Sequence, residues 1–256
     1  MDDSYRHYSR VVDNYARYRP GYPDELVALL EAECGLAPGQ PIADIGSGTG
    51  LLTEVLLRHG YRVAGVEPND AMRATAEARL GGYAGFTSVA ATAEATTLAD
   101  HSVQMITVGN AFHWFNHEQV RPEFERILAP SGWVMLVWNL EWNDGSPFAV
   151  AFEQCWQRHI DPAARFIGMR DRPLPSYISR FFALGGFRQA GIETAQVCDL
   201  AALKGLALST IKAPQADDPR HAAMVADLEA LFNQFNQDGT VTLHYDTAMI
   251  YGQLSQ

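Results

Sequence analysis

The chain has 256 residues, of which 47% are hydrophobic and 19% are charged, an ordinary balance for a soluble globular protein. This length accommodates one large α/β domain or a core with a lid. A formal net charge of −11 argues against a protein that follows nucleic-acid phosphates, because such binding relies on Lys and Arg.

The cysteines, the N-terminal residues and the lengths of the apolar runs narrow the class of protein further. Cys34, Cys155 and Cys198 lie far apart and form no CxxC pair, so we expect a reduced protein without a metal site. The polar first ten residues do not resemble a signal peptide, and no apolar run approaches the roughly 20 residues of a membrane span. We therefore expect a cytoplasmic protein with no membrane or nucleic-acid partner; the sequence leaves the oligomeric state open.

The N-terminal 40 residues are predicted to form a helical cap. Residues 9–18 are predicted to be helical and to end before a rigid turn at Arg19-Pro20-Gly21-Tyr22-Pro23. Asp24 is a candidate cap for a second helix, which would run to Cys34 and stop at Gly35.

Residues 41–68 have the pattern of one βαβ unit. An apolar run, residues 42–45, includes Asp44 and leads into Gly46-Ser47-Gly48-Thr49-Gly50. A helical stretch to His59 and a second apolar run over residues 61–66 follow, and that run ends at Glu67. The glycines suit a tight turn with close backbone approach to a ligand. Glu67, 21 residues after Gly46, is placed to accept hydrogen bonds from ribose hydroxyls.

Strands and helices continue to alternate through about Trp138. We predict a helix over residues 69–80, strands over 86–91, 103–108 and 133–138, and a helix over 118–128. A turn is expected at Pro130-Ser131-Gly132. This alternation predicts a doubly wound, mostly parallel sheet.

The pattern changes after residue 139. Residues 140–186 are rich in aromatic residues, Pro and Arg, and we interpret them as an inserted lid. Within this stretch the spacing of Phe148, Phe152 and Trp156 indicates a helix. Residues 191–197 and 241–251 are predicted strands, joined by a helix over 219–235, which would add an antiparallel edge. The expected fold is a Rossmann-like, seven-stranded α/β domain over 1–256: cap 1–40, cofactor core 41–139, lid 140–186 and completing strands 187–256.

Two classes of nucleotide enzyme compete for the glycine loop. A nicotinamide-dependent enzyme uses GxGxxG, whereas the spacing here is Gly46-x-Gly48-x-Gly50, one residue shorter. The first predicted strand also begins only at Pro41, whereas nicotinamide domains often begin near their own chain start.

The chain resembles class I S-adenosylmethionine-dependent methyltransferases. The resemblance rests on the run 44–50, on Val66-Glu67-Pro68-Asn69 and on Ala93-Glu94. Two further stretches, residues 15–23 and Asn110-Ala-Phe-His113-Trp114-Phe115, are similar to small-molecule methyltransferases of the trans-aconitate and ubiquinone-biosynthesis type.

The resemblance implies S-adenosylmethionine as cofactor and a role for each matching residue. The glycine loop would line its methionine part, Asp44 would orient the amino group, and Glu67 would bind the ribose. Arg19, with Tyr15 beside it, would pair with the cofactor carboxylate. The full implied cofactor set is Tyr15, Arg19, Asp44, Gly46, Ser47, Gly48, Gly50, Glu67, Pro68, Met72, Ala93, Glu94, Asn110 and Ala111.

The acceptor side is predicted from residues beyond the fourth strand and in the lid. His113 is a candidate general base because imidazole titrates near neutrality, with a structural role in its loop as the alternative. Aromatic residues are candidates for the walls of a substrate pocket, or for the core. An arginine would anchor an acidic group. These candidates are Trp114, Phe115, Trp138, Trp142, Phe148, Phe152, Trp156 and Arg165; Arg170 and Arg172 follow close by.

The sequence therefore predicts methyl transfer from S-adenosylmethionine to a small organic acceptor, with an oxygen nucleophile, hydroxyl or carboxylate, favoured. The alternatives are a nicotinamide-dependent oxidoreductase and a non-catalytic relative that binds the cofactor and acts through a protein partner. A nucleic-acid methyltransferase would need a basic surface, and no Asn-Pro-Pro-Tyr-like motif is present.

Overall fold

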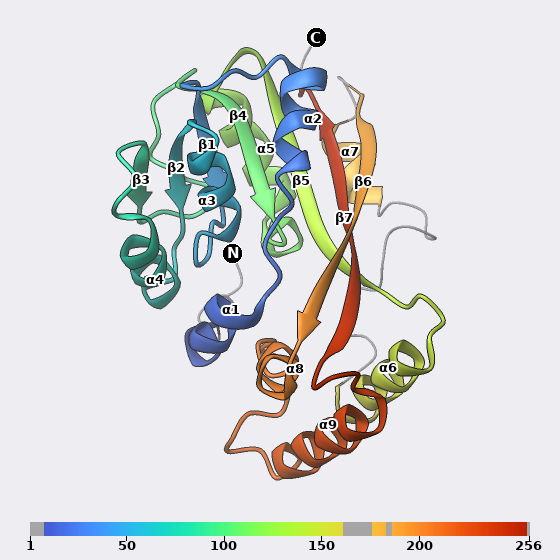
Figure 1. Ribbon diagram of the computed structural model, residues 1–256. Coiled ribbons are helices and arrows are strands. Elements are labelled where there is room, and N and C mark those ends of the chain that lie inside the picture. The colour runs from blue at the N-terminus through green and yellow to red at the C-terminus, as the bar shows by residue number, and fades with distance from the viewer. Residues whose placement is uncertain (1–7, 161–175, 183–185, 255–256) are drawn as a thin grey trace.

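The computed structural model describes residues 8–160, 176–182 and 186–254. Within these residues, seven strands form one mixed sheet in the order β3-β2-β1-β4-β5-β7-β6 (Figure 1). The strands are β1 (Pro41–Ile45), β2 (Arg62–Val66), β3 (Phe86–Val89), β4 (Val103–Gly109), β5 (Leu128–Trp142), β6 (Arg188–Cys198) and β7 (Val241–Gly252). The five strands from β3 to β5 pair in parallel, and β7 pairs antiparallel with both β5 and β6.

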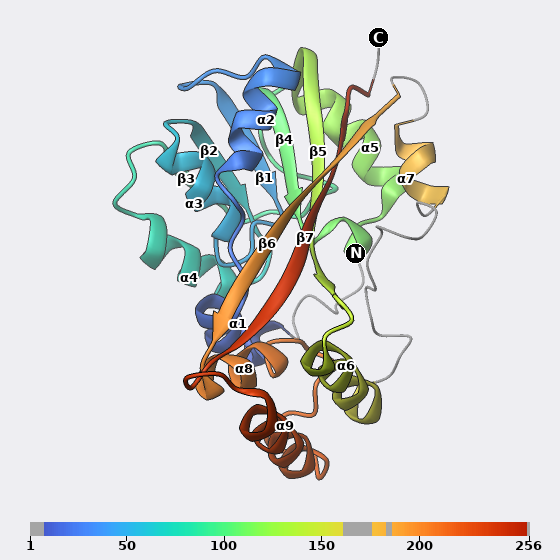
Figure 2. The ribbon, with the colours of Figure 1, turned by 45° about the vertical axis from the view of Figure 1, so that its right-hand side comes forward.

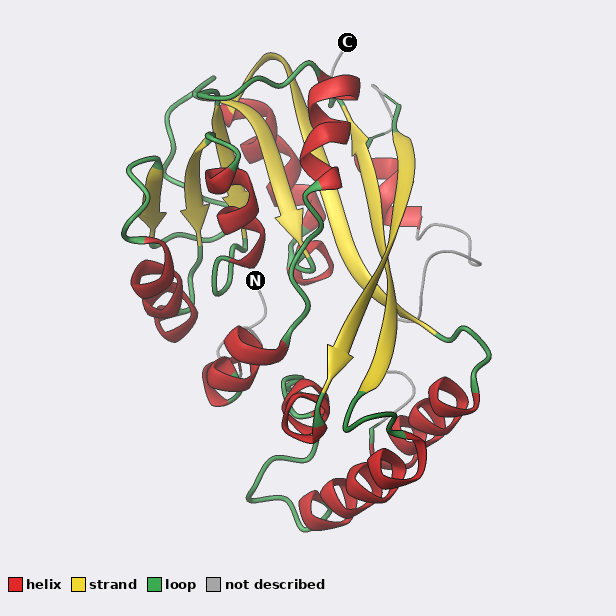
Figure 3. Ribbon diagram, in the orientation of Figure 1, coloured by secondary structure: helices red, strands yellow, loops and turns green. Residues whose placement is uncertain are grey.

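Helices cover both faces of the sheet (Figure 3). One face packs against α2, α3 and α4, and the other against α5 and α7. The helices are α1 (Val12–Tyr18), α2 (Glu25–Cys34), α3 (Leu51–Arg58), α4 (Asp70–Leu80), α5 (His117–Ile127), α6 (Pro147–His159), α7 (Ser176–Phe181), α8 (Leu200–Ala207) and α9 (His221–Phe235), with a short 3-10 helix, η2 (Phe112–Trp114). The predicted α/β fold with late antiparallel strands is confirmed.

Burial on both faces explains why the central strands have continuous apolar runs. Ile42 of β1 packs on the side of α2 and α3, whereas its neighbour Ala43 packs on the side of α5. Asp44 is the one charged residue in β1 and is only 1% exposed, so its carboxylate must find partners inside the protein.

The strand order reverses between β1 and β4, which places a ligand site at the carboxyl ends of these strands. The first residue after β4 marks this end. Asn110 has a positive φ of 51°, and its side chain donates a hydrogen bond to the Tyr22 hydroxyl at 3.0 Å.

A third cluster of helices lies beyond this end of the sheet. Strands β6 and β7 extend past the parallel half as a long antiparallel pair, and α6, α8 and α9 gather at their far end (Figure 2). Helix α1 packs against both α8 and α4. Within this cluster, α6 comes from the predicted lid, whereas α8 and α9 come from the chain after β6. Helix α8 was not predicted, although Asp199 caps it through a hydrogen bond from the Ala202 amide at 2.7 Å.

Two local predictions were wrong. The Asp24 side chain does not cap α2; its carboxylate instead accepts hydrogen bonds from Arg58 at 3.0 Å and His59 at 3.1 Å. Residues 130–132 do not form a separate turn but lie within β5, where Ser131 has a φ of 63° and the register against β4 shifts. The strand absorbs the polar residues as an irregularity, so its pairing begins earlier than predicted.

Candidate active site

The glycine loop is fixed to the end of β2 by its backbone. The amides of Gly46 and Ser47 both donate to the Val66 carbonyl, at 2.8 and 3.2 Å. Gly46 has a φ of 69°, and a Cβ at this position would lie 2.7 Å from the Ala111 Cβ. The loop therefore needs glycine here for its conformation and for its contact with the segment after β4.

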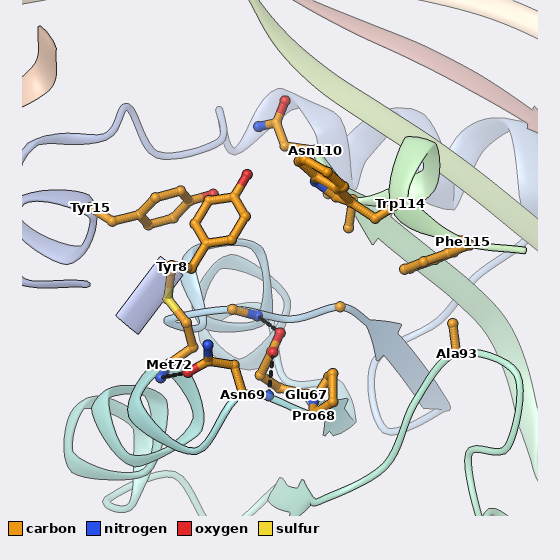
Figure 4. Close-up of a pocket in the computed structure, with 14 residues that line it drawn as sticks. Tyr8, Tyr15, Glu67, Pro68, Asn69, Met72, Ala93, Asn110, Trp114 and Phe115 are labelled. Carbon is orange, nitrogen blue, oxygen red and sulfur yellow. Dashed lines mark hydrogen bonds between the residues drawn. The ribbon is translucent and has the colours of Figure 1, made fainter. Parts of the chain in front are cut away.

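Glu67 is held in one orientation by two backbone amides. Its Oε2 accepts a hydrogen bond from Gly48 N at 2.9 Å, and its Oε1 accepts one from Asn69 N at 2.8 Å (Figure 4). Burial raises the pKa of Glu67, and these two amides oppose that shift. Each carboxylate oxygen has a second lone pair, so Glu67 can still accept hydrogen bonds from a ligand.

A small compartment of about 70 Å³ adjoins Glu67. Its walls are mostly apolar, with the Glu67 carboxylate at one side, a combination that suits a nucleoside. Those walls include Pro68, Met72, Ala93 and Ala111, predicted from the sequence as cofactor residues, and Asn69. They also include Phe115, which was predicted for the acceptor pocket but does not line the larger cavity. The Asn69 side chain accepts from the amides of Ala71 and Met72 and so caps α4 directly behind the compartment.

Two tyrosines from the N-terminal cap close this compartment. The Tyr8 ring centroid lies 5.9 Å from that of Tyr15 and 6.1 Å from that of Trp114, both in edge-to-face geometry. Figure 4 shows the two tyrosines facing Trp114 across the pocket. Burial raises the pKa of Tyr8 to about 12, so its hydroxyl stays protonated. Tyr15 was predicted, whereas Tyr8 was missed because its contact with Trp114 is visible only in the fold.

A second, larger cavity of about 380 Å³ shares the glycine loop, Asn110 and Trp114 with the first. Asp44, Ser47 and Thr49 line one end. The Asp44 carboxylate accepts hydrogen bonds from Thr53 Oγ1 at 2.6 Å and Thr107 Oγ1 at 3.0 Å, and burial raises its pKa to about 6. The Thr49 hydroxyl is buried without a hydrogen-bond partner among the described residues.

Arg19 also lines the larger cavity, as predicted for a ligand-binding cation. Its guanidinium carbon lies 5.3 Å from the centroid of the Tyr15 ring. Its Nε is buried and has no hydrogen-bond partner in the described parts of the chain. A buried donor without a partner costs free energy, so the arrangement fits an anionic ligand group at this position.

His113 lies on η2 and lines the larger cavity. Burial, followed by the nearby positive charge of Lys212, lowers the pKa of His113 to about 4. The expectation that this imidazole titrates near neutrality was therefore wrong: it is neutral at physiological pH and is a weak base.

The far end of the larger cavity is built from the helical cluster and the long strands. Trp138 on β5 contributes to its wall, but the side chain is 1% exposed and packs in the hydrophobic core, the alternative that the sequence left open. Trp156 on α6 and Lys212 in the segment between α8 and α9 line it as well. Lys212 was missed, because the sequence pattern gives no sign that this segment returns to the carboxyl ends of β1 and β4.

Several predicted site residues lie elsewhere. Glu94 accepts a hydrogen bond from the Asn116 amide at 3.0 Å and fixes the loop before α5. Trp142 is 36% exposed beside His244, beyond the cavity. Phe148 packs on Phe152 and Phe235, in the contact between α6 and α9.

Gly50 begins α3 and contacts α4 without lining either compartment. Arg165, Arg170 and Arg172 lie outside the described residues.

One cluster of potential metal ligands occurs among the described residues, away from this site. Atoms of Cys155, His159 and Asp227 lie within 4.8 Å of one another. His159 and Arg158 both pair with the Asp227 carboxylate, at 2.8 and 3.2 Å, which links α6 to α9. No helix in the described ranges is long and apolar enough to cross a membrane.

Comparison with known proteins agrees with this geometry. Residues 43–136 match a family described as the methyltransferase domain. These residues hold β1, the glycine loop, Glu67 and the segment after β4. Over this segment the chain is similar to S-adenosylmethionine-dependent methyltransferases.

Relatives extend the likeness of this methyltransferase domain. An uncharacterized methyltransferase of Mycobacterium tuberculosis is 35% identical over 132 residues, which are 52% of this chain and 51% of the relative. CRG1 of Saccharomyces cerevisiae, named a probable S-adenosylmethionine-dependent methyltransferase, is 30% identical over 125 residues, 46% of this chain and 42% of its own. The match thus spans about half the length of these relatives.

Solved structures share the fold over more of the chain. A protein of Anaeromyxobacter dehalogenans, provisionally assigned as a type II methyltransferase, has a TM-score of 0.66 at 22% identity, covering 93% of this chain and 99% of its own. A methyltransferase of Geobacter sulfurreducens, solved with S-adenosylhomocysteine, has a TM-score of 0.53 at 16% identity and covers 97% of both chains.

The residues of this site fit the family's cofactor. The small compartment offers a fixed carboxylate with free lone pairs and apolar walls for a nucleoside. The adjoining end of the larger cavity offers Asp44, the unpartnered Thr49 hydroxyl and the Arg19 guanidinium, groups that suit an amino-acid tail.

Proposed function

We propose that this protein transfers a methyl group from S-adenosylmethionine to a small organic acceptor, with an oxygen atom as nucleophile. The observation that carries the proposal is Glu67, whose carboxylate is fixed by Gly48 N and Asn69 N at the junction of the glycine loop and an apolar compartment. A fixed carboxylate with free lone pairs at this junction suits the two hydroxyls of a ribose.

The cofactor's adenosine would occupy the small compartment, and its methionine part the near end of the larger cavity. Glu67 would bind the ribose, and Met72 and Pro68 would contact the base. Asp44, with a pKa of about 6, would be drawn to its ionised form by the cofactor's ammonium group. Arg19 would pair with the carboxylate of the same cofactor.

The cofactor supplies a methyl group on a positively charged sulfur; the new bond forms to the acceptor atom, and the electrons of the broken carbon–sulfur bond stay on sulfur. The protein's contribution is to hold the acceptor in line and to exclude water, which accounts for roughly 7–11 kcal/mol of the barrier in favourable cases. Tyr8, Tyr15 and Trp114 would provide the exclusion, because they close the compartment from the side of the N-terminal cap.

His113 would orient the acceptor more than deprotonate it. A general base works best with a pKa near the working pH, and the pKa of His113 is about 4. The neutral imidazole still offers a hydrogen bond to an acceptor hydroxyl. An acceptor oxygen that is already ionised, as in a carboxylate, needs no base at all.

A cavity of about 380 Å³ and a formal net charge of −11 favour a small molecule over a nucleic acid as acceptor. The nicotinamide alternative is disfavoured by the GxGxG spacing and by the family match over residues 43–136. A relative that binds the cofactor without turnover would share the cofactor site and would differ only in lacking methyl transfer.

Calorimetric titration separates the cofactor classes. We expect wild-type protein to bind S-adenosylhomocysteine with a micromolar or tighter Kd and to leave NADH unbound under the same conditions. Binding of NADH, or no binding of S-adenosylhomocysteine, would contradict the proposal. S-adenosylhomocysteine release from S-adenosylmethionine, measured over a panel of small hydroxy and carboxylic acids, then distinguishes the enzyme from a non-catalytic relative, which would release none.

A further inference from the structure

The wall of the larger cavity formed by the helical cluster carries an unusual cation. The chain contains two lysines, Lys204 and Lys212. Lys204 on α8 is paired with Glu229 on α9 at 2.8 Å. Lys212, eight residues later, is an exposed residue that also lines the cavity, and it has no carboxylate partner among the described residues. His113 lines the same cavity, and the charge of Lys212 adds to burial in lowering the pKa of this histidine.

A second donor lies on the same cavity. Trp156 on α6 lines it, and its indole Nε1 is buried with no hydrogen-bond partner in the described ranges. The indole ring is held by edge-to-face packing on Phe152, with ring centroids 6.1 Å apart. A buried N–H group without a partner costs free energy unless a ligand accepts from it.

Both groups can only donate hydrogen bonds. An indole N–H and an ammonium have no acceptor atom, so a ligand group that satisfies both must be an acceptor. Arg19, a third donor-only group on the same cavity, is assigned above to the cofactor carboxylate, which leaves Lys212 and Trp156 for the acceptor. Oxyanions, that is carboxylates and phosphates, are the acceptors that pair best with such cations.

Two acidic residues line this cavity, and neither neutralises Lys212. Asp44 lies at the glycine-loop end and accepts hydrogen bonds from two threonines. Glu141 lies at the exposed end of β5 and forms no ion pair with Lys212. In a chain of net charge −11, a cation left facing a cavity is a local feature and not a consequence of a basic surface.

We propose that the acceptor is an anion whose carboxylate or phosphate binds to Lys212 and Trp156. This inference rests on the proposed function, since it assigns the far end of the larger cavity to the acceptor. Lys212 is then a specificity-determining residue: it selects oxyanion-bearing acceptors over neutral molecules of the same shape.

Binding of three matched probes tests the inference: phenylacetate, phenyl phosphate and the neutral phenylacetamide. Each is titrated calorimetrically into wild-type protein with and without S-adenosylhomocysteine. We expect at least one of the two anions to bind at least tenfold more tightly than phenylacetamide. Phenylacetate and phenyl phosphate distinguish a carboxylate site from a phosphate site.

The variants assign the preference to its residues. Lys212→Gln is expected to reduce the preference to about parity, and Lys212→Arg to restore most of it. Trp156→Phe is expected to weaken binding of the anions at least threefold and to leave phenylacetamide unchanged. Lys204→Gln is the matched control, because it removes the other lysine while leaving the cavity intact, and it should keep the wild-type preference.

Four outcomes would overturn the inference: equal or tighter binding of phenylacetamide, no binding of either anion, a preference that survives Lys212→Gln, or one lost equally in Lys204→Gln. S-adenosylhomocysteine binding is measured in the same titrations. Its failure in wild-type protein would contradict the proposed function and is recorded separately from the anion preference.

Discussion

Asp44 and His113 are both buried beside the larger cavity. Burial shifts the pKa of each group in the direction that favours its uncharged form. The pKa of Asp44 is raised to about 6, and that of His113 is lowered to about 4. Asp44 has two threonine hydroxyls as partners, which limit the shift. At neutral pH His113 is therefore uncharged, whereas Asp44 stays mostly ionised but takes up a proton under mildly acidic conditions.

His113 makes the folded protein sensitive to mild acid. Its folded pKa of about 4 lies below the ordinary value of 6.5, so between these values the unfolded chain binds more protons. Stability from His113 is therefore present above pH 6.5 and is lost as the pH falls toward 4. The loss between pH 7 and pH 5 is expected to be about 2 kcal/mol.

Urea unfolding of wild type and His113→Gln at pH 7 and pH 5 measures this contribution. Asp44 acts in the opposite direction, because its raised pKa favours the folded state as the pH falls from 6 toward 3.8. Its effect is common to both proteins and cancels in the comparison. If His113→Gln loses as much stability as wild type on acidification, the burial argument for His113 is wrong.

Residue spacing predicted the polar groups fixed by local chain geometry. Asp44 and Glu67 follow from their places on β1 and after β2. Tyr8 and Lys212 did not follow, because each reaches the site through packing between distant segments. The prediction that His113 titrates near neutral pH failed for the same reason: its pKa depends on burial by the residues around η2.

At the scale of elements, the junction of the glycine loop and α3 depends on Gly50. Its φ is 82°, and an added Cβ would lie 2.6 Å from Leu80 Cδ1, a side chain that is fully buried. Gly50 therefore sets the contact between α3 and α4, which places the loop beside Glu67. Its role is structural, whereas the sequence had suggested contact with the cofactor.

Gly50→Ala is expected to destabilise the fold more than Gly35→Ala. Both positions have a positive φ, but a Cβ at Gly35 meets nothing within 4 Å. Gly35→Ala should cost about 1 kcal/mol from backbone strain alone. Gly50→Ala should cost about 2–4 kcal/mol, because overpacking against Leu80 adds to the strain. Equal free energies of unfolding in urea titrations of the two variants would contradict this account of the α3–α4 contact.

Helix α6 shows what periodicity leaves undecided. The spacing of Phe148, Phe152 and Trp156 correctly predicted a helix, yet it did not predict which structure each ring meets. Phe148 and Phe152 pack in the cluster with α9, while Trp156 reaches the cavity. A helix has 3.6 residues per turn, so each step of four residues rotates the side-chain direction slightly around the helix axis. The first and last of the three rings therefore face different neighbours.

At the scale of the whole molecule, the parallel half could be predicted and the helical end could not. The strands from β1 to β5 have continuous apolar runs with short connections, which define a doubly wound sheet. The cluster of α6, α8 and α9 is assembled from segments on either side of β6. Its position depends on how far the β6–β7 pair extends beyond the sheet, which no local pattern encodes.

The two ends of the larger cavity are built by different parts of the chain. The glycine-loop end is built mainly by residues 43–136, the part that matches the methyltransferase domain family, with Tyr15 and Arg19 added from the N-terminal cap. Trp156, Lys212 and Tyr245 at the other end lie outside that match. Cofactor and acceptor sites are therefore expected to vary independently among relatives.

The central claim is that Glu67 binds the ribose of an S-adenosyl cofactor. Calorimetric titration of S-adenosylhomocysteine into wild type, Glu67→Ala, Glu67→Gln and the exposed control Glu25→Ala tests it directly. Loss of charge-assisted hydrogen bonds should weaken binding by about 10- to 100-fold in Glu67→Ala and less in Glu67→Gln. Glu25→Ala should match wild type. Equal affinity of all four proteins, each shown to be folded by circular dichroism, would contradict the account.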